Sequence, residues 1–565
     1  MAKDEFRSRI TVEGLDRAPH RAFMRASGLD EDDLGRPRIG IASTHGDNTP
    51  CSMSLAAQAD AARLGVASAG GVPIGFSTIS VSDGISMSHK GMRLSLISRE
   101  IIADSVEAVM RAHAYDALVG FAGCDKTLPG MMMAMVRLNC PSVFVYGGAM
   151  LPGHWRGGDV TVLTAYEGVG RVLANTMTPA ELAALEHACA PTVGACPGQF
   201  TANTMAMVAE AMGLAPPGSA MLPAVYSQRL ALARRAGRRA TEILREAGPL
   251  PRDLVTRKAL ENAAAAVAAT GGSTNAALHL PAIAHEAGIG FSLEDVAQVF
   301  SRTPLIADLQ PGGKYLAIDL FRAGGTDAVL KALLDGGYLH GEELTLSGTT
   351  LSQHLAGLGD PDGDVVRPAS RPLNPNGGLV RLSGNLAPEG ALIKIAGLTR
   401  LQFTGSARVF DSEEACLAAV AARQYQEGEA LIIRYEGPKG GPGMREMLGV
   451  TALIYGQGMG EKVALITDGR FSGATRGMMV GYVGPEAELG GPIALARTGD
   501  GVSIDCVAGT IELLIGEAEL AGRRSAHRPR APERLAGVME KYAKLVGPAC
   551  LGATTHRGAA EWPRE

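Results

Sequence analysis

The feature that most restricts the fold is an alternation of short apolar runs with helical patterns over the first two thirds of the chain. Arg38–Ser43 reads RIGIAS, and Ala117–Gly123 and Ser142–Gly147 are two further apolar runs of strand length. Between the first two, Leu96–His113 places apolar residues at helical spacing. Alternating strands and helices are typical of parallel βαβ units. We therefore predict an α/β domain with a parallel sheet.

The same part of the chain has three further helical patterns, Pro179–Ala188, Ala202–Met212 and Arg257–Ala269. It ends at Gly357–Asn376, which is rich in Gly, Pro, Asp and Asn and is typical of a linker. We therefore predict an α/β domain over residues 1–356, a linker over 357–376 and a second domain over 377–565.

The chain changes character after the linker. Short β-like runs dominate, with few helical patterns between them: Leu379–Leu382, Ala391–Ile395, Ala430–Tyr435, Lys462–Ile466 and Val502–Val507. A last helix is predicted over Glu533–Val546. The second domain is therefore expected to be β-rich.

Composition excludes several classes of protein. The net charge of −5 shows no basic excess, so we expect neither a nucleic acid nor an anionic membrane as a partner. Apolar stretches such as Ala263–Ala269 are far shorter than the roughly 20 residues of a membrane helix. The charged start MAKDEFRSRI lacks the apolar segment of a secretory signal. The eight cysteines are scattered, as in reducing compartments, and we expect a cytoplasmic location.

Three cysteines lie in predicted loops or helix starts. Cys51 lies in TPCSMSL, Cys124 in GCDKTLPG and Cys196 in GACPGQFTANTM. Backbone N–H groups and the helix dipole favour a thiolate at such positions. Three thiolates that converge beyond the carboxyl ends of strands could hold an iron–sulfur cluster and leave one iron open as a Lewis acid. The spacing alone leaves ordinary buried cysteines as the alternative, because no CxxC motif occurs.

A second group of candidate ligands is acidic. Asp83 lies in SVSDGISM, Asp125 directly follows Cys124, and Glu446 lies in GGPGMREM. Carboxylate oxygens of this kind suit Mg²⁺. An Asp-Gly pair is also an ordinary turn signal, and Lys126, beside Asp125, could simply form an ion pair.

A third element is the loop TDGRFSGATRG, which follows the predicted strand KVALI. Ser472 lies among small residues there, where its hydroxyl group could approach a substrate closely. A serine acts as a base only if a nearby metal charge favours its ionised form. The alternative is an ordinary turn serine.

Together these segments resemble the family of dihydroxy-acid dehydratases and the related phosphogluconate and sugar-acid dehydratases. The matching stretches run from about residue 36 to 500. They include TPCSMSL, GGVPIGFSTISVSDGISMSHKGMRLSLISREIIADSVE, GCDKTLPGMMMAMVRLNCPSVFVYGG, GACPGQFTANTMAMVAEAMGLAPPGSA, AATGGSTNAALHLPAIA, GGLVRLSGNLAPEGALIKIAG, YEGPKGGPGMREM and TDGRFSGATRG. These motifs are long and stand in the same order as in the family.

The resemblance implies a role for each candidate residue. Ser472 is similar to the family's catalytic base, and Lys126 to a lysine that is carbamylated. The resemblance further implies Mg²⁺ ligands at Asp83, Asp125 and Glu446, and iron–sulfur ligands at Cys51, Cys124 and Cys196. Relatives with a [4Fe–4S] cluster commonly lack the first cysteine, so its presence implies a [2Fe–2S] cluster.

The resemblance also implies an architecture and a reaction. The second domain should be barrel-like, and the site should lie between the domains of a homodimer or of a dimer of dimers. The expected reaction removes water from a 2,3-dihydroxy acid and leaves a 2-keto acid. An example is the branched-chain precursor 2,3-dihydroxyisovalerate, and the implied pathways are valine and isoleucine biosynthesis.

The sequence departs from the common family pattern at Ser52, Pro197, Gln199 and Tyr482. Gln199 stands where an apolar Met is common, which predicts a pocket that accepts more polar acids. The alternative is that Gln199 bonds to backbone behind the cluster and never meets the substrate. Two other functions also stay open at this point: a sugar-acid dehydratase acting on gluconate- or glycerate-like acids, and an iron–sulfur electron-transfer or sensor protein.

Overall fold

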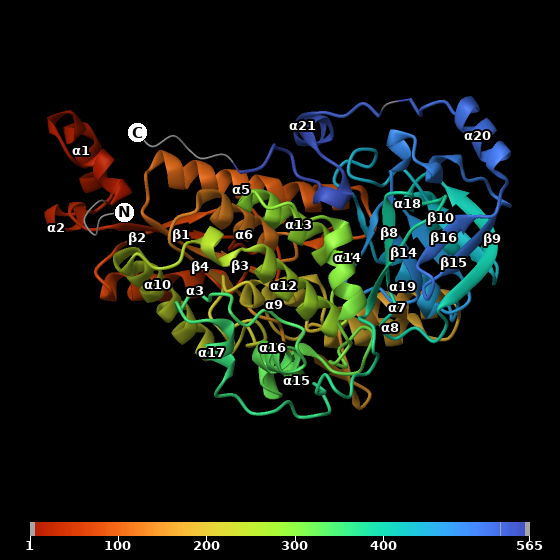
Figure 1. The fold of residues 1–565 in the computed structure, drawn as a ribbon, viewed down its shortest axis with the longest axis horizontal. Coiled ribbons are helices and arrows are strands. Elements are labelled where there is room, and N and C mark those ends of the chain that lie inside the picture. The colour runs from red at the N-terminus through yellow and green to blue at the C-terminus, as the bar shows by residue number, and fades with distance from the viewer. Residues whose placement is uncertain (1–5, 532, 560–565) are drawn as a thin grey trace.

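The computed structural model describes residues 6–531 and 533–559. A parallel sheet with its helices occupies one end of the molecule, and a larger sheet occupies the other (Figure 1). This arrangement confirms the predicted fold class, an α/β part followed by a β-rich part.

The first sheet has four parallel strands in the order β2-β1-β3-β4. The inner strands β1 (Arg38–Ser43) and β3 (Ala117–Ala122), and β4 (Ser142–Tyr146), are buried throughout. This burial explains why each reads as a continuous apolar run, since a parallel sheet is covered on both faces. The edge strand β2 (Val72–Ser77) is partly exposed and was not predicted.

Helices cover both faces of this sheet (Figure 1). α3 (Leu55–Ser68) and α10 (Gln228–Glu246) pack together on one face. α5 (Arg93–Ala112) and α6 (Thr127–Leu138) pack together on the other. Three other predicted helices are also confirmed, two with the predicted bounds and one shifted by one residue: α8 (Pro179–Ala188), α12 (Arg257–Ala269) and α9 (Thr201–Ala211).

The second sheet is mixed and has eight strands. In spatial order they are β16 (Thr510–Leu513), β15 (Gly501–Asp505), β9 (Gln402–Phe410), β10 (Glu429–Ile433), β12 (Ala464–Thr467), β14 (Met478–Gly484), β8 (Gly390–Lys394) and β7 (Leu379–Leu382). The two edge strands approach each other where Ser383 N donates to Gly509 O (2.9 Å) and Ile511 N donates to Ser383 O (3.0 Å). The sheet is therefore nearly closed and barrel-like, as expected.

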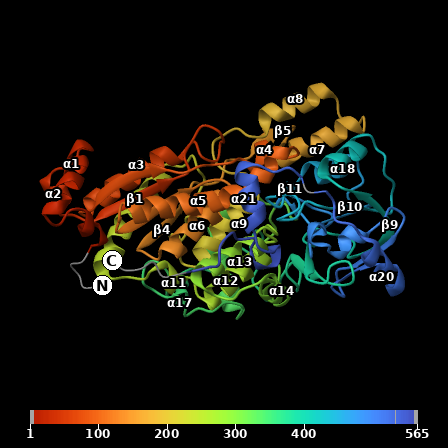
Figure 2. The ribbon, with the colours of Figure 1, turned by 90° about the horizontal axis from the view of Figure 1, so that it is seen from above.

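The C-terminal segment returns to the first half of the molecule (Figure 2). The last helix, α21 (Gly537–Leu545), begins four residues after the predicted start at Glu533. Beyond it, Arg99 Nη2 donates to the carbonyl oxygens of Gly552 (2.8 Å) and Ala553 (2.9 Å). His556 Nε2 lies 2.9 Å from Glu286 Oε1. Among the described residues, no helix is both long and apolar enough to cross a membrane.

Candidate active site

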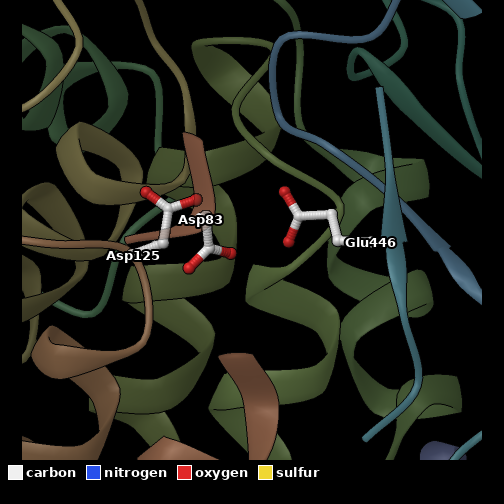
Figure 3. A group of neighbouring side chains, drawn as sticks. All are labelled: Asp83, Asp125 and Glu446. Atoms are coloured by element: carbon white, nitrogen blue, oxygen red, sulfur yellow. The ribbon is translucent and has the colours of Figure 1, made fainter. Parts of the chain in front are cut away.

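Three carboxylates from distant parts of the sequence meet between the two halves of the molecule. Asp83 is the first residue of α4 (Asp83–Ser86), Asp125 lies between β3 and α6, and Glu446 begins β11 (Glu446–Met447). In Figure 3, Glu446 faces Asp83 and Asp125 across a short gap. One oxygen of each carboxylate lies within 4.8 Å of the others. The geometry therefore brings together the acidic residues that the sequence singled out.

A short strand pair places Ser472 beside this acid cluster. β11 runs parallel to β13 (Arg470–Phe471), with Glu446 opposite Arg470. Immediately after β13, Ser472 N donates to Met447 O at 3.0 Å. The serine loop is thus tied to the strand that carries Glu446.

Lys126 lies among the three carboxylates. Its Nζ atom is 2.5 Å from Asp83 Oδ2, 2.9 Å from Glu446 Oε2 and 3.9 Å from Asp125 Oδ2, and its side chain is fully buried. Burial alone would lower the pKa of Lys126, but the carboxylates of Asp83 and Glu446 raise it above the ordinary value. The ammonium group therefore supplies positive charge where the acid cluster requires it.

The acid cluster also has buried oxygens that no protein donor reaches. Ser95 Oγ and Lys126 both donate to Asp83 Oδ2, and Asn275 Nδ2 and Lys126 both donate to Glu446 Oε2. In the described structure, Asp83 Oδ1 and Glu446 Oε1 are buried without a hydrogen-bond partner. A buried acceptor without a partner is costly, and a bound cation would remove that cost. The donor set therefore fits a hard divalent cation.

The electrostatics of the carboxylates reflect their burial. Burial raises the pKa of Asp83, and burial together with the charge of Asp83 raises the pKa of Asp125 to about 7. Burial also opposes ionisation of Glu446, but the charges of Lys126 and Arg470 lower its pKa below the ordinary value. Closely packed carboxylates of this kind favour binding of positive charge.

The loops of the three candidate cysteines lie together at the carboxyl ends of the parallel strands. Gly194 N, two residues before Cys196, donates to Pro50 O at 2.9 Å and so ties the loops of Cys196 and Cys51. The loop of Cys124 packs directly on the Cys51 backbone, because a Cβ atom at Gly123 would overlap the Cys51 carbonyl oxygen. The Cys51 and Cys124 side chains are close enough to hydrogen-bond. The thiols of this trio are free.

The ionisation of these thiols differs from the expectation that loop and helix-start positions favour thiolates. The hydrogen bond to Cys51, followed by burial, raises the pKa of Cys124 well above its ordinary value. Burial raises the pKa of Cys196 to about 12. The hydrogen bond at Cys124 and burial at Cys196 therefore oppose formation of the thiolates. A bound metal ion would reverse this balance, since it favours the thiolate directly. Three neighbouring thiols, two buried and that of Cys196 partly buried, fit an iron–sulfur cluster.

Ser472 lines a small cavity between the two halves of the molecule. The hydroxyl oxygen of Ser472 accepts a hydrogen bond from Ala474 N at 3.3 Å. The residues that line the cavity come from the GGST loop, β8, the serine loop and β14: Thr274, Leu392, Lys394, Phe471, Ser472, Thr475, Gly477, Met479, Gly481 and Tyr482. A small substrate in this cavity would therefore contact the serine loop.

Several residues of the site were not singled out from the sequence. Asn275 and Arg470 both donate to Glu446 Oε2, at 2.8 Å and 3.2 Å, and Ser95 Oγ donates to Asp83 Oδ2 at 2.9 Å. Lys394 lies in the cavity with Ser472. One sequence feature could have marked Lys394 as a candidate site residue: it is a single cation within the apolar run ALIKIAG. Asn275 and Ser95 carried no comparable signal, because polar residues of helices and turns are common.

Gln199 does not lie where a specificity residue is expected. Its Nε2 atom donates to Thr270 Oγ1 at 3.1 Å, and its side chain is buried. It is not among the residues that line the Ser472 cavity. The structure therefore favours the alternative, in which Gln199 bonds within the protein, although its partner is the Thr270 side chain and not backbone. Tyr482 does line the cavity, and its hydroxyl group donates to Thr274 O at 3.1 Å.

Comparison with known proteins agrees with this geometry. Residues 36–354 match the family described as dihydroxy-acid/6-phosphogluconate dehydratase, N-terminal, and residues 364–553 match its C-terminal counterpart. A Bordetella bronchiseptica protein named dihydroxy-acid dehydratase 2 is 65% identical, and the match covers 100% of this chain and 99% of that protein. Dihydroxy-acid dehydratase 3 of Bradyrhizobium diazoefficiens is 60% identical over 99% and 96% of the two chains. A Thermosynechococcus vestitus dihydroxy-acid dehydratase is 49% identical over 98% and 99%.

Fold, site and relatives together define a hydro-lyase, an enzyme that removes water from its substrate. The chain belongs to the dihydroxy-acid/6-phosphogluconate dehydratase family.

Proposed function

We propose that this enzyme converts a 2,3-dihydroxy carboxylic acid, such as 2,3-dihydroxyisovalerate, to the corresponding 2-keto acid. The observation that carries the proposal is the buried acid cluster with two unused carboxylate oxygens, placed next to the Ser472 cavity. The names of the full-length relatives, dihydroxy-acid dehydratase 2 and 3, support the same substrate class. We propose that the enzyme serves branched-chain amino acid biosynthesis, as the resemblance of its motifs to the family implies.

Two cofactors fit the residues present. We propose that Cys51, Cys124 and Cys196 hold a [2Fe–2S] cluster, and that Asp83, Asp125, Glu446 and a carbamylated Lys126 bind Mg²⁺. When bound, these groups supply Lewis acidity to the substrate's hydroxyl and carboxylate oxygens. Carbamylation would join CO₂ to the neutral Lys126 amine with loss of one proton, which replaces a cation that repels Mg²⁺ with an anionic ligand.

The protein's own side chains would then remove the proton from C2 of the substrate. Ser472 would accept the proton from C2 of the substrate, and loss of the C3 hydroxyl group as water would leave an enol that rearranges to the 2-keto acid. Asn275 and Arg470 hold Glu446 in place through hydrogen bonds to Oε2. Ser95 holds Asp83 in the same way.

The test is anaerobic purification followed by an assay of 2-keto acid formation from 2,3-dihydroxyisovalerate, glycerate and gluconate. We expect the highest kcat/KM with 2,3-dihydroxyisovalerate. A preference for gluconate or glycerate would instead identify a sugar-acid dehydratase. A cluster that can be reduced, in a protein that turns over none of these acids, would identify an electron carrier or sensor.

The assembly and location of the enzyme are also proposals. We propose that residues 1–356 and 377–565 form two domains joined by residues 357–376, with the site between them. We further propose a homodimer or a dimer of dimers in the cytoplasm, without nucleic-acid or membrane partners. Light scattering coupled to gel filtration would give the mass in solution, and a mass of one chain would contradict the assembly.

A further inference from the structure

Lys394 is a buried cation without an acidic partner. It is the last residue of β8, and its side chain is almost entirely buried. Among the described residues, its single hydrogen-bond acceptor is Gly473 O, at 3.1 Å from Nζ. Burial lowers the pKa of Lys394 to about 7, and no neighbouring carboxylate offsets this effect. A buried lysine of this kind loses its proton readily near neutral pH.

The position of Lys394 connects it to Ser472. Gly473, which accepts its hydrogen bond, directly follows Ser472, and Lys394 and Ser472 line the same cavity. Tyr482, on β14, is the other titratable side chain among the residues that line this cavity, and burial raises its pKa. On the neighbouring strand β7, Arg381 is paired with Glu294 at 2.9 Å. Lys394 is therefore the group in the cavity that is suited to accept a proton.

Nearby metal charge favours the ionised form of a serine, but the hydroxyl proton still needs a group that accepts it, because a hydroxyl group is not basic at neutral pH. We infer that Lys394 is the proton acceptor for Ser472, so that the neutral amine takes the hydroxyl proton and leaves a serine oxygen able to remove the proton from C2. This inference rests on the proposed function and deepens it. The pairing follows the logic of Ser–Lys dyads in other enzymes.

The proton balance closes over one turnover. The Lys394 amine gains the Ser472 hydroxyl proton and becomes an ammonium group. The Ser472 oxygen then gains the C2 proton, and the electron pair of the C2–H bond forms the C2–C3 double bond as the C3–O bond breaks. The departing hydroxide takes the proton from Lys394 and leaves as water, so both side chains return to their starting states.

The decisive variants are Lys394→Arg, which keeps a cation that cannot lose its proton, and Lys394→Met, which keeps the length without the charge. We expect both to lower kcat by about 10²–10⁴-fold, the usual worth of a general base, with a much smaller change in KM. In the parent enzyme, kcat should rise with pH and level off above about 7, and this pH dependence should disappear in both variants. Lys462→Met is the matched control, because Lys462 is half-exposed and paired with Glu427 on the surface, and it should leave the profile unchanged.

A second measurement does not depend on the variants' folding. Lysine labelled with ¹³C at Cε reports its own protonation by NMR, and the Lys394 signal is assigned by its absence from the Lys394→Arg spectrum, or from that of Lys394→Met. We expect this signal in the parent enzyme to titrate near pH 7, well below the surface lysines. Titration near pH 10, or a Lys394→Arg enzyme with normal kcat and pH profile, would overturn the inference. A parent enzyme that dehydrates no acid would instead overturn the proposed function, while the NMR titration would still report on Lys394.

Discussion

Cys51 is the residue that separates the two types of cluster considered for this enzyme. We expect Cys51→Ala to lose the cluster and the dehydratase activity together, because one of three ligands is removed. Iron and sulfide analysis, with EPR spectra of the reduced protein, would measure this loss. Cys416→Ala is the control, since Cys416 lies buried in a separate apolar cluster, and it should keep both properties. About four irons per chain in freshly prepared protein would contradict a [2Fe–2S] cluster.

Lys126 tests whether the acid cluster binds a metal through a modified lysine. We expect ¹³C-labelled bicarbonate to give a carbamate NMR signal in the Mg²⁺-loaded protein and no such signal in Lys126→Met. Treatment with EDTA should remove activity while the visible absorption of the iron–sulfur cluster stays, because the two sets of ligands differ. An active, Mg²⁺-loaded enzyme with an unmodified amine at this position would contradict the prediction.

Ser472 is predicted to be the base that removes the C2 proton of the substrate, which allows this proton to exchange with solvent. Ser472→Ala should keep the cluster and Mg²⁺, because this side chain belongs to neither proposed ligand set. It should lose C2 exchange with deuterated solvent by about 10²–10⁴-fold. Exchange at the parent rate would require a different base. Ser347→Ala is the control, because Ser347 lies in an exposed hydrogen-bonded turn and is not among the residues that line the cavity.

At the scale of elements, the approach of the Cys51 and Cys124 loops depends on Gly123. A methyl group there would overlap the Cys51 carbonyl oxygen, and backbone cannot move aside as a flexible side chain can. We expect Gly123→Ala to separate the loops and to lower the cluster content of the purified protein. Gly522→Ala, in α20 (Glu517–Ala526), has open space around it and should be neutral or stabilise the fold by about 0.5–1 kcal/mol. Normal iron content in Gly123→Ala would show that the loops tolerate the change.

The sequence predicts the bounds of some elements in both halves of the molecule. β1 and β7 have the predicted bounds, as do helices α8 and α12. β2 was missed because it contains Pro73 and is partly exposed, so it lacks a continuous apolar run. β9 was missed because its burial is irregular along its length. Apolar patterns therefore identify many of the strands, whereas a strand that contains proline or is irregularly buried depends on pairing that local sequence does not encode.

The site shows a similar limit. The residue types of Asp83, Asp125 and Glu446 marked them as candidate ligands, and the structure brings them together. Their neighbours Asn275 and Arg470 come from other segments and act through hydrogen bonds that only the folded chain creates. Long-range contacts of this kind have no signature in sequence spacing.

At the scale of the whole molecule, the packing of the C-terminal segment depends on pH. The hydrogen bond to Glu286 raises the pKa of His556 above 6.5, while Arg137 and Glu100 are the other charged groups near it. A raised histidine pKa adds stability that is fully present below about pH 6.5 and is lost as the pH rises through the folded-state pKa. Urea unfolding at several pH values should show this decline. His556→Gln should flatten the decline, and an unchanged slope in that variant would contradict the prediction.

Glu286 adds a second, acidic limit to the same contact. Burial opposes its ionisation, but His556 and Arg137 lower its pKa below 4.5. This stabilisation is present above about pH 4.5 and is lost as the pH falls through the lower folded-state pKa. The segment should therefore be held most firmly in mildly acidic solution.

The return of residues 547–558 to the first half of the molecule has a consequence for the order of synthesis. Arg99 is in the first half of the chain. Its buried guanidinium group nevertheless donates to the carbonyl oxygens of Gly552 and Ala553, which are synthesised some 450 residues later. Nascent domains usually complete their folding as they emerge. Glu100 Oε1 also accepts from Arg99 Nη2, at 2.7 Å, but the two carbonyl acceptors do not exist until residues 552 and 553 have been made. The parallel-sheet half therefore completes this contact only after most of the second half has been synthesised.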